Sequence, residues 1–414
     1  MKVLPRRASV QVFVVFGCAY FLSALIRAIT ATLSPVLSQE FALHARDLGL
    51  LAGGYFFGFA ITQFPLGKWL DRHGPKRVIV CLLAVAVLGC LAVSSATSFV
   101  GLLAARVVCG VGLSACLMAP LTGYRRWFSP ATQMRASSWM LMTGSMGMIA
   151  STLPVQWLLP LWGWRALFVA LAVLLLLAAA LIAWRVPAWG AARADGQDQE
   201  TQPRGYGEVW RNPFFRAMAP VGFFCYGGLL AVQTLWAAPW MEHMAGYSPL
   251  QAAAGLFWIN VAMLCTFWSW GLVNPWLARH GIHAGRLLHW GLPASFLLLA
   301  IIIVAPARFP AWTGALLVLY CMACSFVTPS QPAVGMAFAP EAAGRALSAY
   351  NLVIFVGVFV IQWGIGLMID GFAWLGASPG LSFQLAFAVF LSCSIGSYLH
   401  FRWATGHNRA PATP

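Results

Sequence analysis

The chain has 414 residues, of which 61% are hydrophobic and only 8% are Asp, Glu, Lys or Arg. A soluble domain carries about a quarter charged residues, and a mean hydropathy of +0.78 requires lipid around most of the surface. This composition excludes a soluble enzyme, a DNA-binding domain and a secreted disulfide scaffold. The ten acidic residues lie in or at the ends of the hydrophilic breaks between apolar runs, and the basic residues cluster in alternate breaks. The formal charge of +15 therefore indicates membrane topology and not nucleic acid.

Twelve apolar runs are long enough to cross a bilayer as helices, which takes about 20 residues each. They lie near 10–37, 48–68, 78–97, 99–121, 137–159, 165–185, 217–240, 250–275, 288–306, 312–334, 347–369 and 381–402. The first run follows Lys2, Arg6 and Arg7 but is too long for a signal peptide, so we expect it to be retained as the first helix. The pattern predicts an all-α membrane protein with twelve transmembrane helices.

The lysines and arginines predict the orientation of these helices. With the N-terminus in the cytoplasm, twenty of the 25 basic residues lie in cytoplasmic segments, and three, Arg46, Arg165 and Arg308, lie on the other side. The remaining two, Arg27 and Arg106, fall inside helices. This bias predicts that both chain ends are cytoplasmic, and we expect the membrane to be a bacterial inner membrane.

One break, 186–216, is rich in Pro, Gly and charged residues and predicts a solvated linker. It divides the chain into an N-terminal six-helix bundle over 1–185 and a C-terminal six-helix bundle over 217–403, with a cytoplasmic tail over 404–414. The halves repeat, because the stretch WLDRHG at 69–74 returns 207 residues later as WLARHG at 276–281. Parallel repeats of this kind are typical of transporters, whose solute site lies near the midplane between the halves.

The loop at 67–77, GKWLDRHGPKR, resembles the signature loop of the major facilitator superfamily, and Arg106 with Gly110 and Gly112 is similar to that family's fourth-helix pattern. The resemblance implies two pseudo-symmetric six-helix bundles and transport by alternating access. It also implies a cytoplasmic latch that stabilises the outward-open state. The latch residues would be Gly67, Asp71, Arg72, Gly74, Lys76 and Arg77. Alternatively, the basic residues of this loop only set the topology, which explains Lys76 and Arg77 but not the Asp-Arg-x-Gly spacing.

Arg27 is the most informative single residue, since an arginine at a helix centre costs about 2.5–3.5 kcal/mol on insertion scales. Tyr20, Ser23 and Thr30 share its helix face at spacings of three and four residues. We interpret this face as a cavity wall that offers a cation and hydroxyl groups to a solute. The alternative is an arginine that snorkels or is paired near the outer surface. For Arg106 two interpretations remain open: it lines the same cavity, or it holds neighbouring helices together.

Polar side chains in other helices are candidates for the rest of the cavity wall, or they only hydrogen-bond helices to one another. These candidates are Gln63, Tyr226, Gln233, Asn260, Asn351 and Gln362. The third and sixth runs contain no charged or amide side chain over 78–92 and 166–183, which is typical of peripheral, lipid-facing helices. The ten cysteines all lie in apolar runs and are expected to behave as small buried hydrophobes.

The runs contain no nucleophile constellation, carboxylate pair or metal-ligand cluster, so we expect no enzyme, no cofactor and no metal. Two intramembrane arginines without acidic partners favour a secondary transporter for a small anionic organic solute, coupled to protons or to exchange. For proton movement there remain Asp47, Glu242 and Asp370 near the outer helix ends, or a proton that binds together with the solute as its own protonation. Alternatives are a proton-driven efflux pump for drugs or metabolites and a non-transporting membrane sensor. The expected partners are the solute, the lipid bilayer and protons, with no nucleic acid, and the chain is expected to be a monomer.

Overall fold

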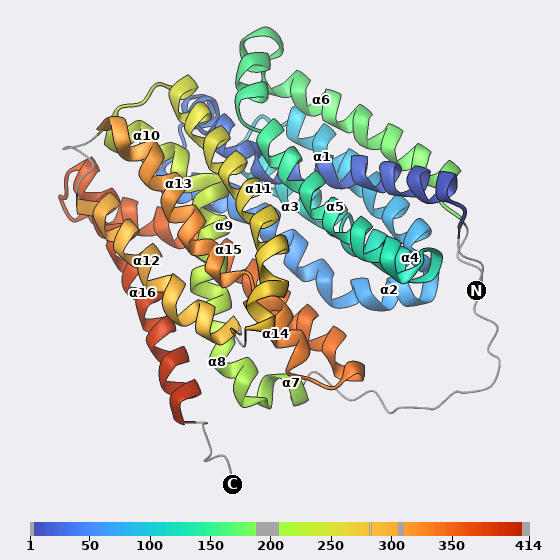
Figure 1. The fold of residues 1–414 in the computed structure, drawn as a ribbon. Helices are drawn as coiled ribbons and strands as arrows, with labels where there is room; N and C mark the ends of the chain where they lie inside the picture. Colours follow the sequence, from blue (N-terminus) through green and yellow to red (C-terminus); the bar gives the residue numbers. More distant parts are fainter. Residues whose placement is uncertain (1–3, 188–206, 281, 283, 305–309, 408–414) are drawn as a thin grey trace.

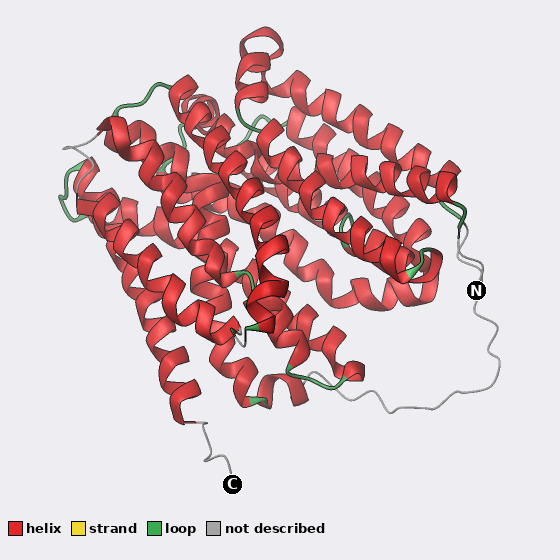
Figure 2. Cartoon of the chain, viewed as in Figure 1, coloured by secondary structure: helices red, strands yellow, loops and turns green. Residues whose placement is uncertain are grey.

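The computed structural model describes residues 4–187, 207–280, 282, 284–304 and 310–407. In this part of the chain the only regular elements are helices (Figure 2). The helices of the first half are α1 (Arg6–Phe41), α2 (Ala45–Ser94), α3 (Phe99–Leu113), α4 (Met118–Trp127), α5 (Pro130–Ala150) and α6 (Leu153–Arg185). The all-α fold expected from the sequence is confirmed.

The second half contains more, shorter elements because several of its spans are interrupted (Figure 1). They are α7 (Gly207–Arg211), α8 (Pro213–Val221), the π-helical turn η1 (Gly222–Tyr226), α9 (Gly227–Ala231), the π-helical turn η2 (Val232–Trp236), α10 (Ala237–Ala245), α11 (Pro249–Arg279), α12 (Ala284–Val304), the 3₁₀ turn η3 (Pro310–Trp312), α13 (Thr313–Cys324), the 3₁₀ turn η4 (Ser325–Val327), α14 (Ser330–Met336), α15 (Pro340–Trp374) and α16 (Pro379–His407). The elements from α8 to α10 form one continuous span over 213–245.

Eleven described segments are long and apolar enough to cross a membrane. Two of the long helices contain a reversal at a glycine, Gly74 in α2 (φ 76°) and Gly163 in α6 (φ 71°). Both glycines adopt the left-handed region that favours this residue. The expected run 137–159 is divided between α5 and the start of α6, and α5 is the long helix that the eleven segments leave out. Together with α5, the eleven segments correspond to the twelve expected runs.

The expected linker, 186–216, falls largely outside the described residues, but its end is helical. The short helix α7 covers 207–211, and α8 begins at Pro213, four residues before the predicted start of the second bundle. The Asn212 side chain caps α8 by accepting hydrogen bonds from the Phe214 and Phe215 N–H groups at 2.9 and 3.2 Å. The predicted domain bounds remain predictions.

The helices that meet at the centre come from both halves of the chain. Along the interface α2 packs against α15 and α5 packs against α11, while α1 contacts η2 and α10. The most buried spans are 6–41 and 213–245, whose apolar windows are 72% and 78% buried, against 44% for 72–94 and 153–185, which contain the two runs expected to be peripheral. Polar residues on α1 and on the α8–α10 span therefore lie in the interior of the molecule.

We call the side where α1 and α8 begin and α6 and α16 end the terminal side, and the opposite side the distal side. All ten cysteines are free thiols, and six of them are buried as expected. The expectation is wrong for four, because Cys18, Cys81, Cys265 and Cys393 are exposed on helix surfaces. The Sγ atoms of Cys90 and Cys109 lie 4.0 Å apart in a buried contact between α2 and α3.

Candidate functional site

Arg27 lies on α1 in the interior of the molecule and is partly buried. Its Nη2 contacts the Met148 sulfur of α5 at 3.8 Å, and a thioether is only a weak acceptor. Its buried Nε has no hydrogen-bond partner. The guanidinium therefore retains hydrogen-bonding capacity that the surrounding protein does not satisfy.

Arg106 on α3 is the second interior cation and is 2% exposed. Its Nη1 donates to the Ile26 carbonyl of α1 at 3.0 Å, one residue before Arg27. Its guanidinium carbon stands 5.2 Å from the centre of the Tyr55 ring, a cation–π distance. The Nε and Nη2 atoms are buried without a partner. One N–H of Arg106 thus holds α1, and the other nitrogens are not used by the described protein.

Tyr55 on α2 is a residue that sequence reasoning missed. It is fully buried, and its hydroxyl has no hydrogen-bond partner. Arg27 and Arg106 both lie within electrostatic reach of this hydroxyl. The only signal in the sequence is a phenol in the middle of an apolar run, which is weaker than the charged and amide side chains that mark the other candidates.

Two further tyrosines lie near Arg27, one from each half of the chain. Tyr20 of α1 is buried against Gly144 of α5, where a Cβ would lie 2.5 Å from the ring. Tyr226 lies in the π-helical turn η1, within electrostatic reach of both Tyr20 and Arg27. Arg27, Arg106, Tyr55, Tyr20 and Tyr226 form what we call the central basic cluster, which draws on α1, α2, α3 and η1.

The other two predicted residues of the α1 face are buried as well. The Ser23 hydroxyl donates to the Leu113 carbonyl of α3 at 3.5 Å. Thr30 is 2% exposed. These contacts are compatible with a polar wall and with helix–helix bonding alike, so the cavity role of both residues stays a prediction.

Amide side chains of the second half form a separate, neutral network. The Gln233 Nε2 donates to the Asn260 Oδ1 at 2.9 Å, and the Asn260 Nδ2 donates to the Leu256 carbonyl at 2.8 Å. The Gln362 Nε2 donates to the Thr234 hydroxyl at 3.0 Å, while its buried Oε1 has no partner. Gln233 and Thr234 belong to the π-helical turn η2, and such turns occur frequently at functional sites.

The remaining predicted cavity residues lie closer to the terminal side. The Gln63 Nε2 donates to the Ser114 carbonyl at 3.4 Å, and Gln63 lines a narrow crevice of only about 10 Å³ together with Trp210 and Leu352. The Asn351 side chain accepts a hydrogen bond from Gln331. The predicted residues thus divide into the basic cluster, the amide network and this terminal-side group, and their contact with a solute stays a prediction.

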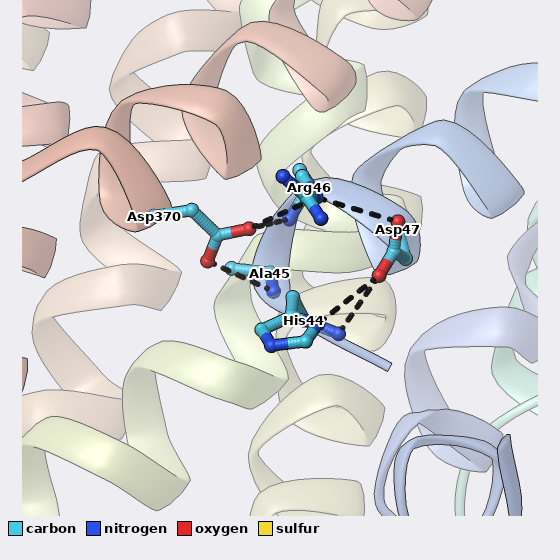
Figure 3. A network of polar contacts seen from close by, with 5 residues as sticks. All are labelled: His44, Ala45, Arg46, Asp47 and Asp370. Atoms are coloured by element: carbon cyan, nitrogen blue, oxygen red, sulfur yellow. Dashed lines mark hydrogen bonds and ion pairs between the residues drawn. The ribbon is translucent and has the colours of Figure 1, made fainter. Parts of the chain in front are cut away.

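On the distal side, a carboxylate of one half caps a helix of the other (Figure 3). Asp370 of α15 accepts hydrogen bonds from the first two N–H groups of α2, those of Ala45 at 3.2 Å and Arg46 at 3.0 Å. Its Oδ2 also lies 3.9 Å from the Arg46 Nε. Asp47 accepts from the His44 N–H at 3.1 Å and completes the cap within α2. We call these residues, His44 to Asp47 with Asp370, the distal clasp.

Below the distal clasp, α2 and α15 touch backbone to backbone at glycines. A Cβ on Gly49 would lie 2.3 Å from the Gln362 carbonyl oxygen, and a Cβ on Gly366 would lie 2.3 Å from the Ala45 carbonyl oxygen. Only glycine fits at such an approach. Toward the terminal side α2 and α15 are in contact through aromatic rings, and the ring centres of Phe59 and Phe355 are 4.6 Å apart. The two halves are therefore closed against each other on the distal side.

A second distal ion pair lies within the first half. The Arg165 Nη1 is 2.6 Å from the Glu40 Oε1, and the Trp164 indole donates to the Glu40 Oε2 at 2.7 Å. Arg165 also donates to the Ala96 carbonyl at 3.0 Å. These contacts join the end of α1 and the end of α2 to the reversal at Gly163 within α6.

The predicted cytoplasmic latch lies at the reversal within α2. Gly74 supplies the left-handed turn of the loop, with φ 76°. Arg72 and Arg77 are exposed, Lys76 is partly buried, and Gly67 is exposed, with open space for at least 4 Å around the position that a Cβ would take. The Asp71 side chain lies outside the described side chains. The latch would stabilise a state closed on the terminal side, whereas the contacts above close the distal side, so the latch stays a prediction.

Comparison with known proteins identifies the family. The model of the Major Facilitator Superfamily matches residues 16–362, and the chain belongs to this family. Members of the superfamily are membrane transporters, which confirms the expectations of an integral membrane protein that is not an enzyme. Among the described residues, no group of three or more His, Cys, Asp or Glu is placed to hold a metal ion.

The relatives are distant and aligned over part of their length. The chain is 25% identical over 248 residues to the probable sulfoacetate transporter SauU of Cupriavidus necator, and this match covers 56% of this chain and 57% of the relative. It is 26% identical over 167 residues to the 4-hydroxybenzoate transporter PcaK of Pseudomonas aeruginosa, covering 40% and 37%. The chain thus spans about half the length, or less, of these relatives.

The fold matches solved transporters over nearly the whole chain. A bacterial homologue of the human lysosomal transporter Spinster, solved in an inward-facing and unoccupied conformation, superposes with a TM-score of 0.78 and 17% identity, covering 99% of this chain and 100% of that one. This likeness confirms the expected fold class of two six-helix bundles.

Proposed function

We propose that the chain is a secondary transporter of a small organic anion and works by alternating access. The observation that carries this proposal is the central basic cluster. Arg27 and Arg106 place two guanidinium groups in the interior, and among the described residues neither has a carboxylate partner. An uncompensated buried cation is costly, and a bound carboxylate or sulfonate would offset that cost.

The unused donors of the cluster suit an oxyanion. Arg27 Nε, Arg106 Nε and Nη2, and the Tyr55 hydroxyl are all buried without a partner. Arginine presents its N–H groups in a planar fork that matches carboxylate geometry. Two distant relatives, named for transport of sulfoacetate and of 4-hydroxybenzoate, support a solute of this class.

Binding of anions to the purified chain tests this function. We expect sulfoacetate or 4-hydroxybenzoate to raise the melting temperature, since a ligand at 100 times its Kd adds about 2.7 kcal/mol of stability. The neutral 4-hydroxybenzamide should have no effect. Arg27→Gln should abolish the shift, Arg27→Lys should retain part of it, and Arg402→Gln, an exposed arginine on α16, should leave it unchanged.

Two outcomes would contradict the proposal. One is an Arg27→Gln protein that binds these anions as well as the parent. The other is a neutral amide that stabilises the parent as strongly as the acids do. Counterflow of the same labelled anions in proteoliposomes then distinguishes a transporter from a protein that only binds.

We further propose a bacterial inner-membrane location with the terminal side in the cytoplasm, supported by the excess of basic residues on that side. Glu242 is our candidate for proton coupling. Among the described residues it forms no hydrogen bond or ion pair, whereas Asp47, Asp370 and Glu40 are all engaged. Glu242 is partly buried in α10, the last helical segment of the span that carries Tyr226 and Gln233.

A further inference from the structure

A groove of about 850 Å³ follows the outer face of α8, between residues of α15 and α16. Apolar and aromatic side chains form most of its surface, among them Pro220 and Phe224 of the α8 span and Trp403 of α16. A smaller hollow of about 360 Å³ shares Pro213, Ala217 and Ala404 with it. The volume is that of a small-molecule site, which typically measures about 300–1,000 Å³.

The groove has the depth of a single membrane leaflet. From Pro213 to Phe224 the helix rises about 16 Å at 1.5 Å per residue, which is half of a hydrocarbon core about 30 Å thick. Its terminal end carries two tryptophans, Trp210 and Trp403, that are 43% and 64% exposed. Tryptophan is enriched at the membrane–water interface, so the groove extends from that interface toward the bilayer centre.

The same end of the groove carries an arginine and a histidine. Arg216 and His400 both line the groove and both are exposed. The His400 ring lies 6.3 Å from the Trp403 ring, centre to centre. Among the described residues, Arg216 and His400 form no ion pair, and neither does Glu208 on the neighbouring α7. The groove thus combines an apolar floor with the unneutralised positive charge of Arg216 at headgroup level.

We propose that this groove binds one phospholipid with an anionic headgroup, drawn from the leaflet on the terminal side. The acyl chains lie along Pro220 and Phe224, and Arg216 donates hydrogen bonds to the phosphate with His400 beside it. An arginine near a helix end reaches the interface in this way by snorkelling. Basic pockets between transmembrane helices are a known way of binding anionic lipid headgroups. This site is separate from the central basic cluster and does not depend on the proposed solute.

Native mass spectrometry of the full chain, purified in detergent and titrated with phosphatidylglycerol or phosphatidylcholine, tests the proposal. We expect one phosphatidylglycerol to be retained in preference to phosphatidylcholine. Arg216→Gln should weaken that retention about five-fold, the equivalent of about 1 kcal/mol for one basic residue at an anionic surface. Arg216→Gln with His400→Gln should weaken it further.

The matched control is Arg402→Gln, which removes an exposed arginine of α16 that does not line the groove. Equal loss of phosphatidylglycerol in Arg402→Gln and Arg216→Gln would show that only net charge matters and would overturn the proposal. Equal retention of the two lipids by the parent would also overturn it. Gel filtration of each variant verifies folding, and a second substitution at the same site, Arg216→Lys, should restore most of the binding.

Discussion

The distal clasp makes a quantitative prediction about alternating access. Asp370 joins α15 to the N-terminus of α2, so its contacts exist only while the halves are closed on the distal side. Asp370→Asn removes the negative charge, and an amide presents one acceptor oxygen to the two N–H groups, those of Ala45 and Arg46, that the carboxylate binds at 3.2 and 3.0 Å. We therefore expect the substitution to shift the equilibrium toward distal opening.

The size of the shift follows from the geometry. A charge at a helix N-terminus contributes about 0.3–1 kcal/mol when exposed and up to about 2 kcal/mol when partly buried. The Asp370 side chain is 22% exposed, which places it between these cases, and we take about 1 kcal/mol as the loss. That loss raises the ratio of distal-open to distal-closed molecules about five-fold.

The assay is labelling by a membrane-impermeant maleimide added to intact cells. The reporter is Ile369→Cys, because Ile369 lies on the α15 face that carries Gly366 and is 5% exposed. The reporter should react about five times faster with Asp370→Asn than without it, after subtraction of the labelling of native cysteines.

The control is Asp47→Asn, a carboxylate of the same helix end whose hydrogen bond to the His44 N–H stays within one half. Labelling in this control should stay close to that of the parent. The reasoning is refuted if Asp370→Asn labels no faster than the parent, or if the Asp47 control accelerates labelling to the same extent.

Three further substitutions test other parts of the structure. Gly366→Ala places a Cβ 2.3 Å from the Ala45 carbonyl oxygen and should lower the free energy of unfolding by about 1–3 kcal/mol. The control is Gly371→Ala on the same helix, which has no atom within 4 Å of the added Cβ and should be neutral or slightly stabilising in thermal unfolding. Equal effects of the two substitutions would contradict the close packing of α2 and α15. Glu40→Gln weakens the 2.6 Å ion pair with Arg165. Because both side chains are about 40% exposed, the melting temperature should fall by the equivalent of no more than about 1 kcal/mol. A larger fall would show that the pair contributes more than a surface ion pair. Glu242→Gln should remove the dependence of anion uptake on an inward proton gradient while leaving counterflow intact, and uptake that still follows the gradient would exclude Glu242 as the coupling residue.

The expected polar wall was only partly predictable. The sequence identified Arg27 and Arg106 because a charged residue within an apolar run is conspicuous against its neighbours. It did not identify Tyr55, since a tyrosine is common in such runs and becomes notable only when its hydroxyl is found buried without a partner. The π-helical turns that carry Tyr226 and Gln233 also leave no recognised mark in the sequence.

The sequence by itself determined the all-α membrane architecture, the family and the two-half repeat, because hydropathy, run length and loop charge are local properties that a single chain segment carries. Only the tertiary structure decided which polar groups meet. The carboxylate of Asp370 was expected to be a candidate proton site, yet it caps a helix that begins 325 residues earlier. That contact depends on glycines 49 and 366 letting two helix backbones approach, and such an approach is a property of the packed pair and of neither helix alone.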